Sequence, residues 1–352
     1  MQASVFTQHN IPEQMAVELT NRARMALANN TKSNYQSVKN NIKKCEETMC
    51  CDLSFPWNEP KKTITFLAYL LLTRKVKAST ANCQLSAVRM AHLELGLDSP
   101  ILRDPVVKLL LKGTEHWEKV SADFSEKVTR TPVIWETMLA IKRITFEVNW
   151  PLWQKDLFLA VCCLLWSGSL RVHEALSRCL DSYDPQTTLL GRDVRLTTVR
   201  AGGSEREIIQ ITIKSPKEDR VGNGTTLEIF GNGTFLCPIK AMKHYINSRG
   251  GLTKIKADKP FFLQKNNKCY TGKCFNSHLS QVTAGITDST GSVIRSHSFR
   301  AGVPSQLARL GVSSEVIKGV GRWSSDAYKS YCKLGITRRM NMVDQISKDL
   351  PK

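Results

Sequence analysis

The sequence predicts a mainly helical protein of two domains, with a small β-sheet in the second domain. Three observations lead to this fold class. The chain has 352 residues, a length at which two domains are more typical than one. Apolar residues recur at helical spacing along most of the sequence. Two segments rich in Ile and Thr, residues 208–213 and 225–230, have instead the composition of paired β-strands.

The first part of the chain predicts an all-helical module of four or five helices. Its second helix is rich in lysine, and the Pro-Trp-Asn-Glu-Pro segment at 56–60 interrupts the helical pattern. Proline is well tolerated in the first turn of a helix, which favours a helix that starts at Pro105. The predicted helices cover 16–27, 31–45, 64–72, a segment that begins at Ser79 and Thr80, and Pro105 to Leu111, and the module ends near Val120.

A polar, charged segment at 121–131 separates this module from the rest of the chain. It is poor in large apolar residues, as interdomain linkers are. We therefore expect a first domain at 1–125, a linker at 126–131, a second domain at 132–333 and a C-terminal tail at 334–352.

The second domain predicts helices around a β-hairpin. Residues 152–166 are apolar almost all round, which is typical of a central core helix. The polar stretch at 214–224 lies between the two predicted strands and has the composition of a turn. The other predicted helices cover 133–146, 238–247, 273–282, 299–310, 314–320 and 326–333, and a short amphipathic piece covers 337–346.

The charge of the chain favours a polyanionic partner. The formal net charge is +19, of which residues 1–125 carry +4 and residues 126–352 carry +15. Such an excess attracts nucleic acid, and here mainly to the second domain. The alternative is a basic protein without a specific target.

Membrane and metal functions have no support in the sequence. The longest apolar stretch, 157–166, is too short to span a bilayer, and the N-terminus lacks the apolar run of a signal peptide. The 11 cysteines include no Cys-x-x-Cys pair, so we expect reduced thiols and no metal site.

Three short motifs in the second domain could act on a phosphodiester. Arg171 follows a predicted helix end, and a guanidinium beside a helix N-terminus can bind phosphate, with Glu174 one turn away to hold it. The alternative is an ordinary surface Arg–Glu pair. His297 and Arg300 are three residues apart and share a helix face, where the histidine can move a proton and the arginine can neutralise charge. The alternative is an exposed helix start.

The third motif, residues 321–333, holds two tyrosines in a basic segment. A tyrosine hydroxyl can attack phosphorus when cations stabilise its negative charge. The alternative is packing, since Tyr328 and Tyr331 are three residues apart and aromatic residues at this spacing usually form a core stripe.

The order of these motifs resembles the tyrosine recombinase (phage integrase) family. The resemblance covers residues 133–333, and the helical module is similar in pattern to that family's core-binding (SAM-like) domain. The Gly-Arg-Trp-Ser-Ser-Asp-Ala-Tyr-Lys-Ser-Tyr segment at 321–331 and Leu-Cys-Pro-Ile-Lys-Ala at 236–241 look most like recombinases of eukaryotic mobile elements of the Crypton and DIRS kinds.

The resemblance implies a role for each matched residue. Two arginines would bind the scissile phosphate, His297 would assist proton transfer, and Trp323 stands where many members have histidine. Glu174 would support the first arginine. The implied catalytic residues are Arg171, Lys217, His297, Arg300, Trp323 and Tyr331, and the implied DNA-binding residues are Lys214, Arg295, Arg322, Lys39 and Lys43.

Two of these assignments leave a choice open. The family has a catalytic lysine on the hairpin turn, where Lys217 fits the motif better and Lys214 is the alternative. The nucleophile is assigned to Tyr331, which follows Trp323 by eight residues, one fewer than is usual in the family. Tyr328 departs further from that spacing.

The resemblance further implies a site-specific recombinase that cleaves and rejoins double-stranded DNA through a 3′-phosphotyrosine intermediate. It implies no cofactor and no metal, a homo-tetramer on two DNA sites with a dimer or monomer off DNA, and no membrane. We expect nuclear localisation in a eukaryotic host and a cytoplasmic one otherwise. The alternatives are a catalytically inactive DNA-binding protein and a DNA-relaxing enzyme of the type IB topoisomerase kind.

Overall fold

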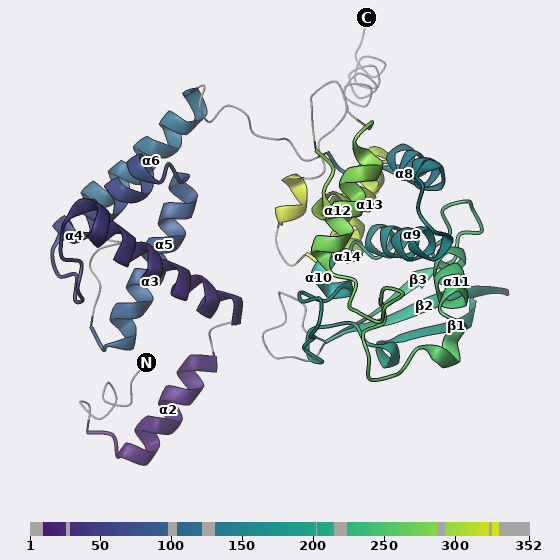
Figure 1. Cartoon of the computed structure of the whole chain (residues 1–352), viewed down its shortest axis with the longest axis horizontal. Coiled ribbons are helices and arrows are strands. Elements are labelled where there is room, and N and C mark those ends of the chain that lie inside the picture. Colours follow the sequence, from purple (N-terminus) through teal and green to yellow (C-terminus); the bar gives the residue numbers. More distant parts are fainter. Residues whose placement is uncertain are drawn as a thin grey trace, which may run out of the picture. The chain divides into compact units, whose positions relative to one another are not determined.

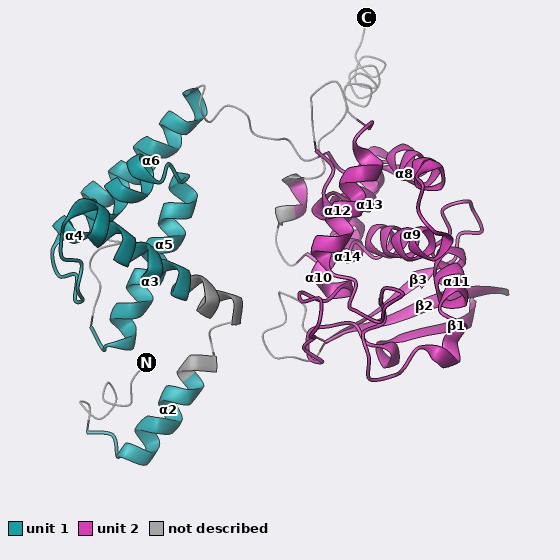
Figure 2. Cartoon of the chain, in the orientation of Figure 1, with its two compact units in different colours: residues 1–127 teal, residues 128–352 magenta. Residues whose placement is uncertain are grey.

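The computed structural model divides the chain into two compact units, residues 1–127 and 128–352 (Figure 2). The division falls within the predicted linker, 126–131. Each unit has its own hydrophobic core, so each is described by itself. The structure describes residues 10–25, 29–97, 104–121, 131–201, 203–214, 224–286, 293–323 and 326–330.

The regular secondary structure among the described residues of the first unit is all helical. Its core surrounds Trp57, whose indole N–H donates to Leu53 O (2.7 Å) and whose backbone N–H donates to the imidazole Nε2 of His92 (2.8 Å). The last helix continues to Val120 rather than ending at Leu111, and the Asp104 side chain caps its start. The helices are α2 (Glu13–Met25), α3 (Asn29–Met49), α4 (Pro60–Ala68), which continues into the π-helical turn η1 (Tyr69–Thr73), α5 (Ala78–Glu94) and α6 (Pro105–Val120).

The second unit is built around helix α9 (Leu152–Ser167), which is buried on every side from Leu157 to Trp166. This confirms the predicted central helix. Figure 1 shows α9 between a layer of helices and the sheet with α11. The other helices are α8 (Trp135–Glu147), α10 (Val172–Ala175), α11 (Pro238–Ser248), α12 (Gly272–Thr283), α13 (Ser296–Arg309) and α14 (Ser314–Gly321), with short 3-10 turns η3 (Gly191–Asp193), η4 (Leu252–Lys254) and η5 (Asp326–Ser330).

The sheet has three antiparallel strands in the order β1-β2-β3, where two were predicted. Strand β3 (Thr225–Phe230) has its predicted bounds, and β2 (Ser204–Ile213) begins earlier than expected. Ile209 pairs with Ile229, and both are buried. Strand β1 (Val194–Ala201) was not predicted, because arginines and threonines make up half of it and two adjacent threonines interrupt the apolar alternation.

Helix α13 begins at residue 296 instead of the predicted 299, so its first turn includes His297. The segment before α8 joins this turn to α9. Val133 N donates to Ser298 O (2.9 Å), and the Trp166 indole N–H donates to Val133 O (2.7 Å). A Cβ atom on Gly302 would lie 2.1 Å from Val133 O. Glycine therefore allows α13 to reach this position against α9.

None of the described helices combines the length and the apolar character needed to cross a membrane.

Replacing Gly302 with alanine should destabilise the second unit, because its Cβ would also come within 2.7 Å of the Trp166 indole nitrogen. We expect Gly302→Ala to lower the free energy of unfolding by about 1–3 kcal/mol, the usual cost of overpacking a core. Urea denaturation followed by tryptophan fluorescence measures it. Gly319→Ala is the matched control, since nothing lies within 4 Å of its added Cβ. Equal stability of the Gly302 variant and the wild type would contradict this packing constraint.

Candidate active site

Arg171 and Glu174 are joined in the turn that follows α9. Helix α9 ends at Gly168, and Arg171 is the N-cap of α10. Arg171 N donates to Glu174 Oε2 (2.9 Å), and its Nη1 donates to Oε1 (3.0 Å). The Glu174 side chain is only 5% exposed. The carboxylate is therefore buried while the Arg171 side chain is 25% exposed, so the pair is not an ordinary surface ion pair.

Arg300 enters the same place from α13. Its side chain is 1% exposed. Nη1 donates to the backbone carbonyl of Ser169 (2.6 Å), and Nη2 donates to that of Gly321 (3.0 Å). Nη1 also lies 4.0 Å from Glu174 Oε2, and the guanidinium carbon lies 5.2 Å from the centre of the Trp323 ring. Two backbone carbonyls and an aromatic face thus hold a buried cation in one orientation.

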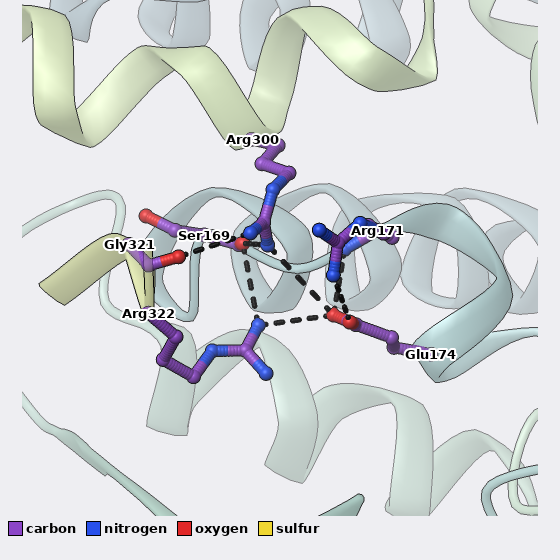
Figure 3. Close-up of polar contacts among 6 residues, drawn as sticks. All are labelled: Ser169, Arg171, Glu174, Arg300, Gly321 and Arg322. Atoms are coloured by element: carbon purple, nitrogen blue, oxygen red, sulfur yellow. Dashed lines mark hydrogen bonds and ion pairs between the residues drawn. The ribbon is translucent and has the colours of Figure 1, made fainter. Parts of the chain in front are cut away.

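Arg322 completes the cluster from the end of α14. Its Nη2 donates to Glu174 Oε2 (2.9 Å) and, at 3.4 Å, to the carbonyl of Ser169. Figure 3 shows the three guanidinium groups of Arg171, Arg300 and Arg322 turned toward one carboxylate. The three arginines come from segments that lie far apart in the sequence, and Glu174 connects them.

The surrounding charges keep Glu174 ionised. Burial on its own raises the pKa of the carboxyl, but the Arg322 charge, the hydrogen bonds from Arg171 N and Arg322, and the Arg300 charge outweigh it and leave the pKa below its usual value. Three guanidinium groups and one carboxylate give the cluster a net charge of +2. A cluster with excess positive charge of this kind favours an anion, and planar guanidinium groups suit phosphate oxygens best.

The structure also places the other described residues of the predicted site. His297 and Arg300 both lie on α13, one turn apart, and Arg295 is the N-cap of that helix. Lys214 follows the end of β2 and forms an ion pair with buried Asp193 (Nζ to Oδ2, 2.7 Å). Lys39 and Lys43 are exposed on α3 in the first unit. Lys217 and Tyr331 lie outside the described residues.

Tyr328 has a packing environment. It lies on η5, is 6% exposed, and its ring centre is 6.3 Å from that of Trp323. The Lys318 ammonium lies 5.5 Å from the Tyr328 ring centre, and Asp326 pairs with that lysine at 2.7 Å. These contacts account for Tyr328 as a residue that fixes η5 against α14.

Three groups of the site were not predicted from the sequence. The carbonyl oxygens of Ser169 and Gly321 orient Arg300, and Asp193 pairs with Lys214. Every residue has a backbone carbonyl, so no residue type could have pointed to the first two. Asp193 is the last residue of the short 3-10 turn η3, which the sequence does not signal. Among the described residues, no three His, Cys, Asp or Glu side chains are grouped so that they could hold a metal ion.

The fold is that of the tyrosine recombinases. A lambda integrase dimer bound to a COC′ core site is 14% identical, with a TM-score of 0.51, over 87% of this chain and 72% of the integrase. The Tn1549 transposon integrase in complex with transposon right end DNA is 14% identical, with a TM-score of 0.55, over 94% and 98%. The XerH site-specific recombinase bound to a palindromic difH substrate is 12% identical, with a TM-score of 0.53, over 86% and 75%.

These similarities lie in the structure and not in the sequence. No protein-family model matches the chain, and no curated protein matches it. The mainly helical fold with a small three-stranded sheet confirms the predicted fold class.

Neutralising Glu174 should destabilise the protein at neutral pH. In Glu174→Gln the buried guanidinium groups lose their counter-charge, and we expect a loss of about 3 kcal/mol in the free energy of unfolding. The pKa of Glu174 is lowered by folding, so its contribution is complete above the unfolded value of about 4.3 and is lost as the pH falls through the folded value. Urea denaturation at several pH values should therefore show the two proteins converging below about pH 4. A difference that is independent of pH would contradict this account.

Proposed function

We propose that the protein is a site-specific DNA recombinase that cleaves and rejoins DNA through a tyrosine. The observation that carries the proposal is the arginine cluster around Glu174, which occurs within a tyrosine recombinase fold. The neighbours of that fold were solved as integrases and a site-specific recombinase on DNA. The net charge of +19 supports DNA as the partner of this chain as well.

In the proposed reaction the hydroxyl of Tyr331 attacks the scissile phosphorus. A bond forms between the tyrosine oxygen and phosphorus, and the bond from phosphorus to the 5′ oxygen breaks. The tyrosine gives up its proton with help from His297, and Lys217, or Lys214 as the alternative, gives a proton to the leaving 5′ oxygen. The products are a 3′-phosphotyrosine and a free 5′ hydroxyl. Because the ester link conserves the bond energy, a 5′ hydroxyl of a second DNA can reverse the step without ATP.

The arginines are proposed to stabilise the negative charge that builds up on the scissile phosphate in the transition state. A phosphodiester carries one negative charge, and its equatorial oxygens gather more as the nucleophile approaches. Arg171 and Arg300 are held by groups of the protein itself, one by Glu174 and the other by two backbone carbonyls. Such fixed donors stabilise the transition state without reorganising. Trp323 can donate its indole N–H but cannot act as an acid or base.

The wider assignment follows the sequence resemblance. We propose DNA contacts by Lys39 and Lys43 in the first unit and by Arg295 and Lys214 in the second, and a role in moving a mobile element of the Crypton or DIRS kind. A DNA-relaxing enzyme or an inactive DNA-binding protein is the alternative. Relaxation of a plasmid by a monomer would favour the former, and DNA binding without a covalent adduct the latter.

Covalent trapping tests this function directly. The full chain is mixed with fragmented genomic DNA of its source in EDTA and quenched with SDS, and the protein-linked DNA is sequenced. We expect linked DNA with the wild type and with Tyr328→Phe, and none with Tyr331→Phe, because only Tyr331 is proposed to form the ester.

The matched tyrosine variants make the result decisive. Adducts that vanish only with Tyr328→Phe would keep the reaction and overturn the nucleophile. Tight binding without any wild-type adduct would contradict a recombinase. Recovery of adducts only when Mg²⁺ is restored would contradict a reaction without metal.

The tail at residues 334–352 provides a test of assembly. We propose that four protomers act on two DNA sites and that the amphipathic tail, which lies outside the described residues, packs on a neighbouring protomer. Deleting the tail should then abolish tetramers on DNA, measured by analytical ultracentrifugation, and leave binding to a single site intact. Persistence of tetramers after truncation would instead indicate a tail that caps its own protomer.

A further inference from the structure

Arg322 occupies a backbone position that normally favours glycine. Helix α14 ends in a Schellman turn, in which Trp323 N donates to Lys318 O (3.0 Å) and Arg322 N donates to Gly319 O (3.1 Å). Arg322 takes the left-handed conformation of this turn, with φ 56° and ψ 48°. A side chain with a Cβ atom is strained there, so the protein keeps an arginine where glycine would fit better.

The Arg322 side chain is built into the site and still has a free donor. It is 16% exposed, and its Nη2 is held by Glu174 and by the carbonyl of Ser169. Its Nε is buried and has no hydrogen-bond partner among the described residues. A buried unpaired donor is costly, and on a cation an oxyanion is the partner that relieves the cost best.

The net charge of the cluster also favours an anionic ligand. Glu174 can neutralise only one of the three guanidinium groups that surround it, which leaves +2. With Arg171 and Arg300 alone, one positive charge would remain, which is enough to balance the single negative charge of a phosphodiester in its ground state. The pentacoordinate transition state approaches two negative charges. Arg322 supplies the second.

We propose that Arg322 is a third phosphate-binding arginine, which with Arg171 and Arg300 forms a socket of charge +2 for the phosphorus in its transition state. The proposal rests on the proposed function for its reaction, but the socket itself should bind a dianionic tetrahedral oxyanion without DNA. Sulfate is the probe, since it is a fixed dianion of the right shape.

The first measurement is calorimetric titration of sulfate into the full chain at constant ionic strength. We expect binding to the wild type, at least tenfold weaker binding to Arg322→Gln, and an intermediate affinity for Arg322→Lys, which keeps the charge but loses the fork of donors. Arg143→Gln is the control, because Arg143 is exposed on α8 with a side-chain exposure of 76%. Thermal melting verifies that each variant is folded. If Arg322→Gln binds sulfate as the wild type does, or if the wild type binds none, the third arginine has no such role.

The second measurement separates charge stabilisation from positioning. Single-turnover cleavage by the wild type and by Arg322→Gln is measured on two substrates. One has a phosphate and the other a neutral methylphosphonate at the cleavage site mapped by covalent trapping. Loss of one such donor should slow cleavage of the phosphate by about 10²–10³-fold. The loss on the methylphosphonate should be under tenfold, since less charge develops there. Equal losses on both substrates would mean that Arg322 only positions Glu174, and would overturn the proposal.

The two measurements also distinguish the proposals from each other. If the wild type forms no DNA adduct but binds sulfate, and Arg322→Gln binds sulfate more weakly, then the proposed recombinase function fails and the proposed anion site stands. If DNA is cleaved and Arg322→Gln matches the wild type in both measurements, the proposed recombinase function stands and the proposed role of Arg322 is wrong.

Discussion

The Glu174 carboxylate lies among guanidinium groups from three segments, at residues 171, 300 and 322. Each of these cations is partly or fully buried, and a buried cation without a counter-charge would cost several kcal/mol. One ionised acid therefore makes the cluster possible, and it still leaves excess positive charge. The excess positive charge gives the cluster an attraction for an anion.

The geometry of the cluster depends in turn on how α13 and α14 meet the turn after α9. Arg300 reaches the carbonyl of Ser169 because α13 approaches α9 closely at Gly302, where a methyl group has no space. A Cβ on Gly321 would lie 1.6 Å from the Trp323 ring, so that glycine sets the place of the ring over Arg300. Glycines that carry no chemistry thus decide where the chemical groups lie.

Much of the second unit could be predicted from the sequence, because its strongest signals are local. The apolar run of α9 and the bounds of β3 follow from composition, and the motif order selected Arg171, Glu174 and Arg300. The link between Glu174 and Arg322 spans 148 residues, and no spacing rule reaches that far. Arg322 was predicted only as a DNA contact. The carbonyls that orient Arg300 belong to the backbone, so their role depends on a turn conformation that residue types do not encode.

Two of the six non-glycine residues with a positive φ among the described residues lie in the arginine cluster. Ser169 has φ 46° and Arg322 has φ 56°, and both contribute to the cluster. Left-handed conformations at residues other than glycine cost of order 1–3 kcal/mol each, and they persist where surrounding structure enforces them. Glycine at residue 322 would relieve the turn but remove a cation from the site. The chain thus combines a strained backbone with a third guanidinium beside Glu174, a combination that the proposed anion at this site explains.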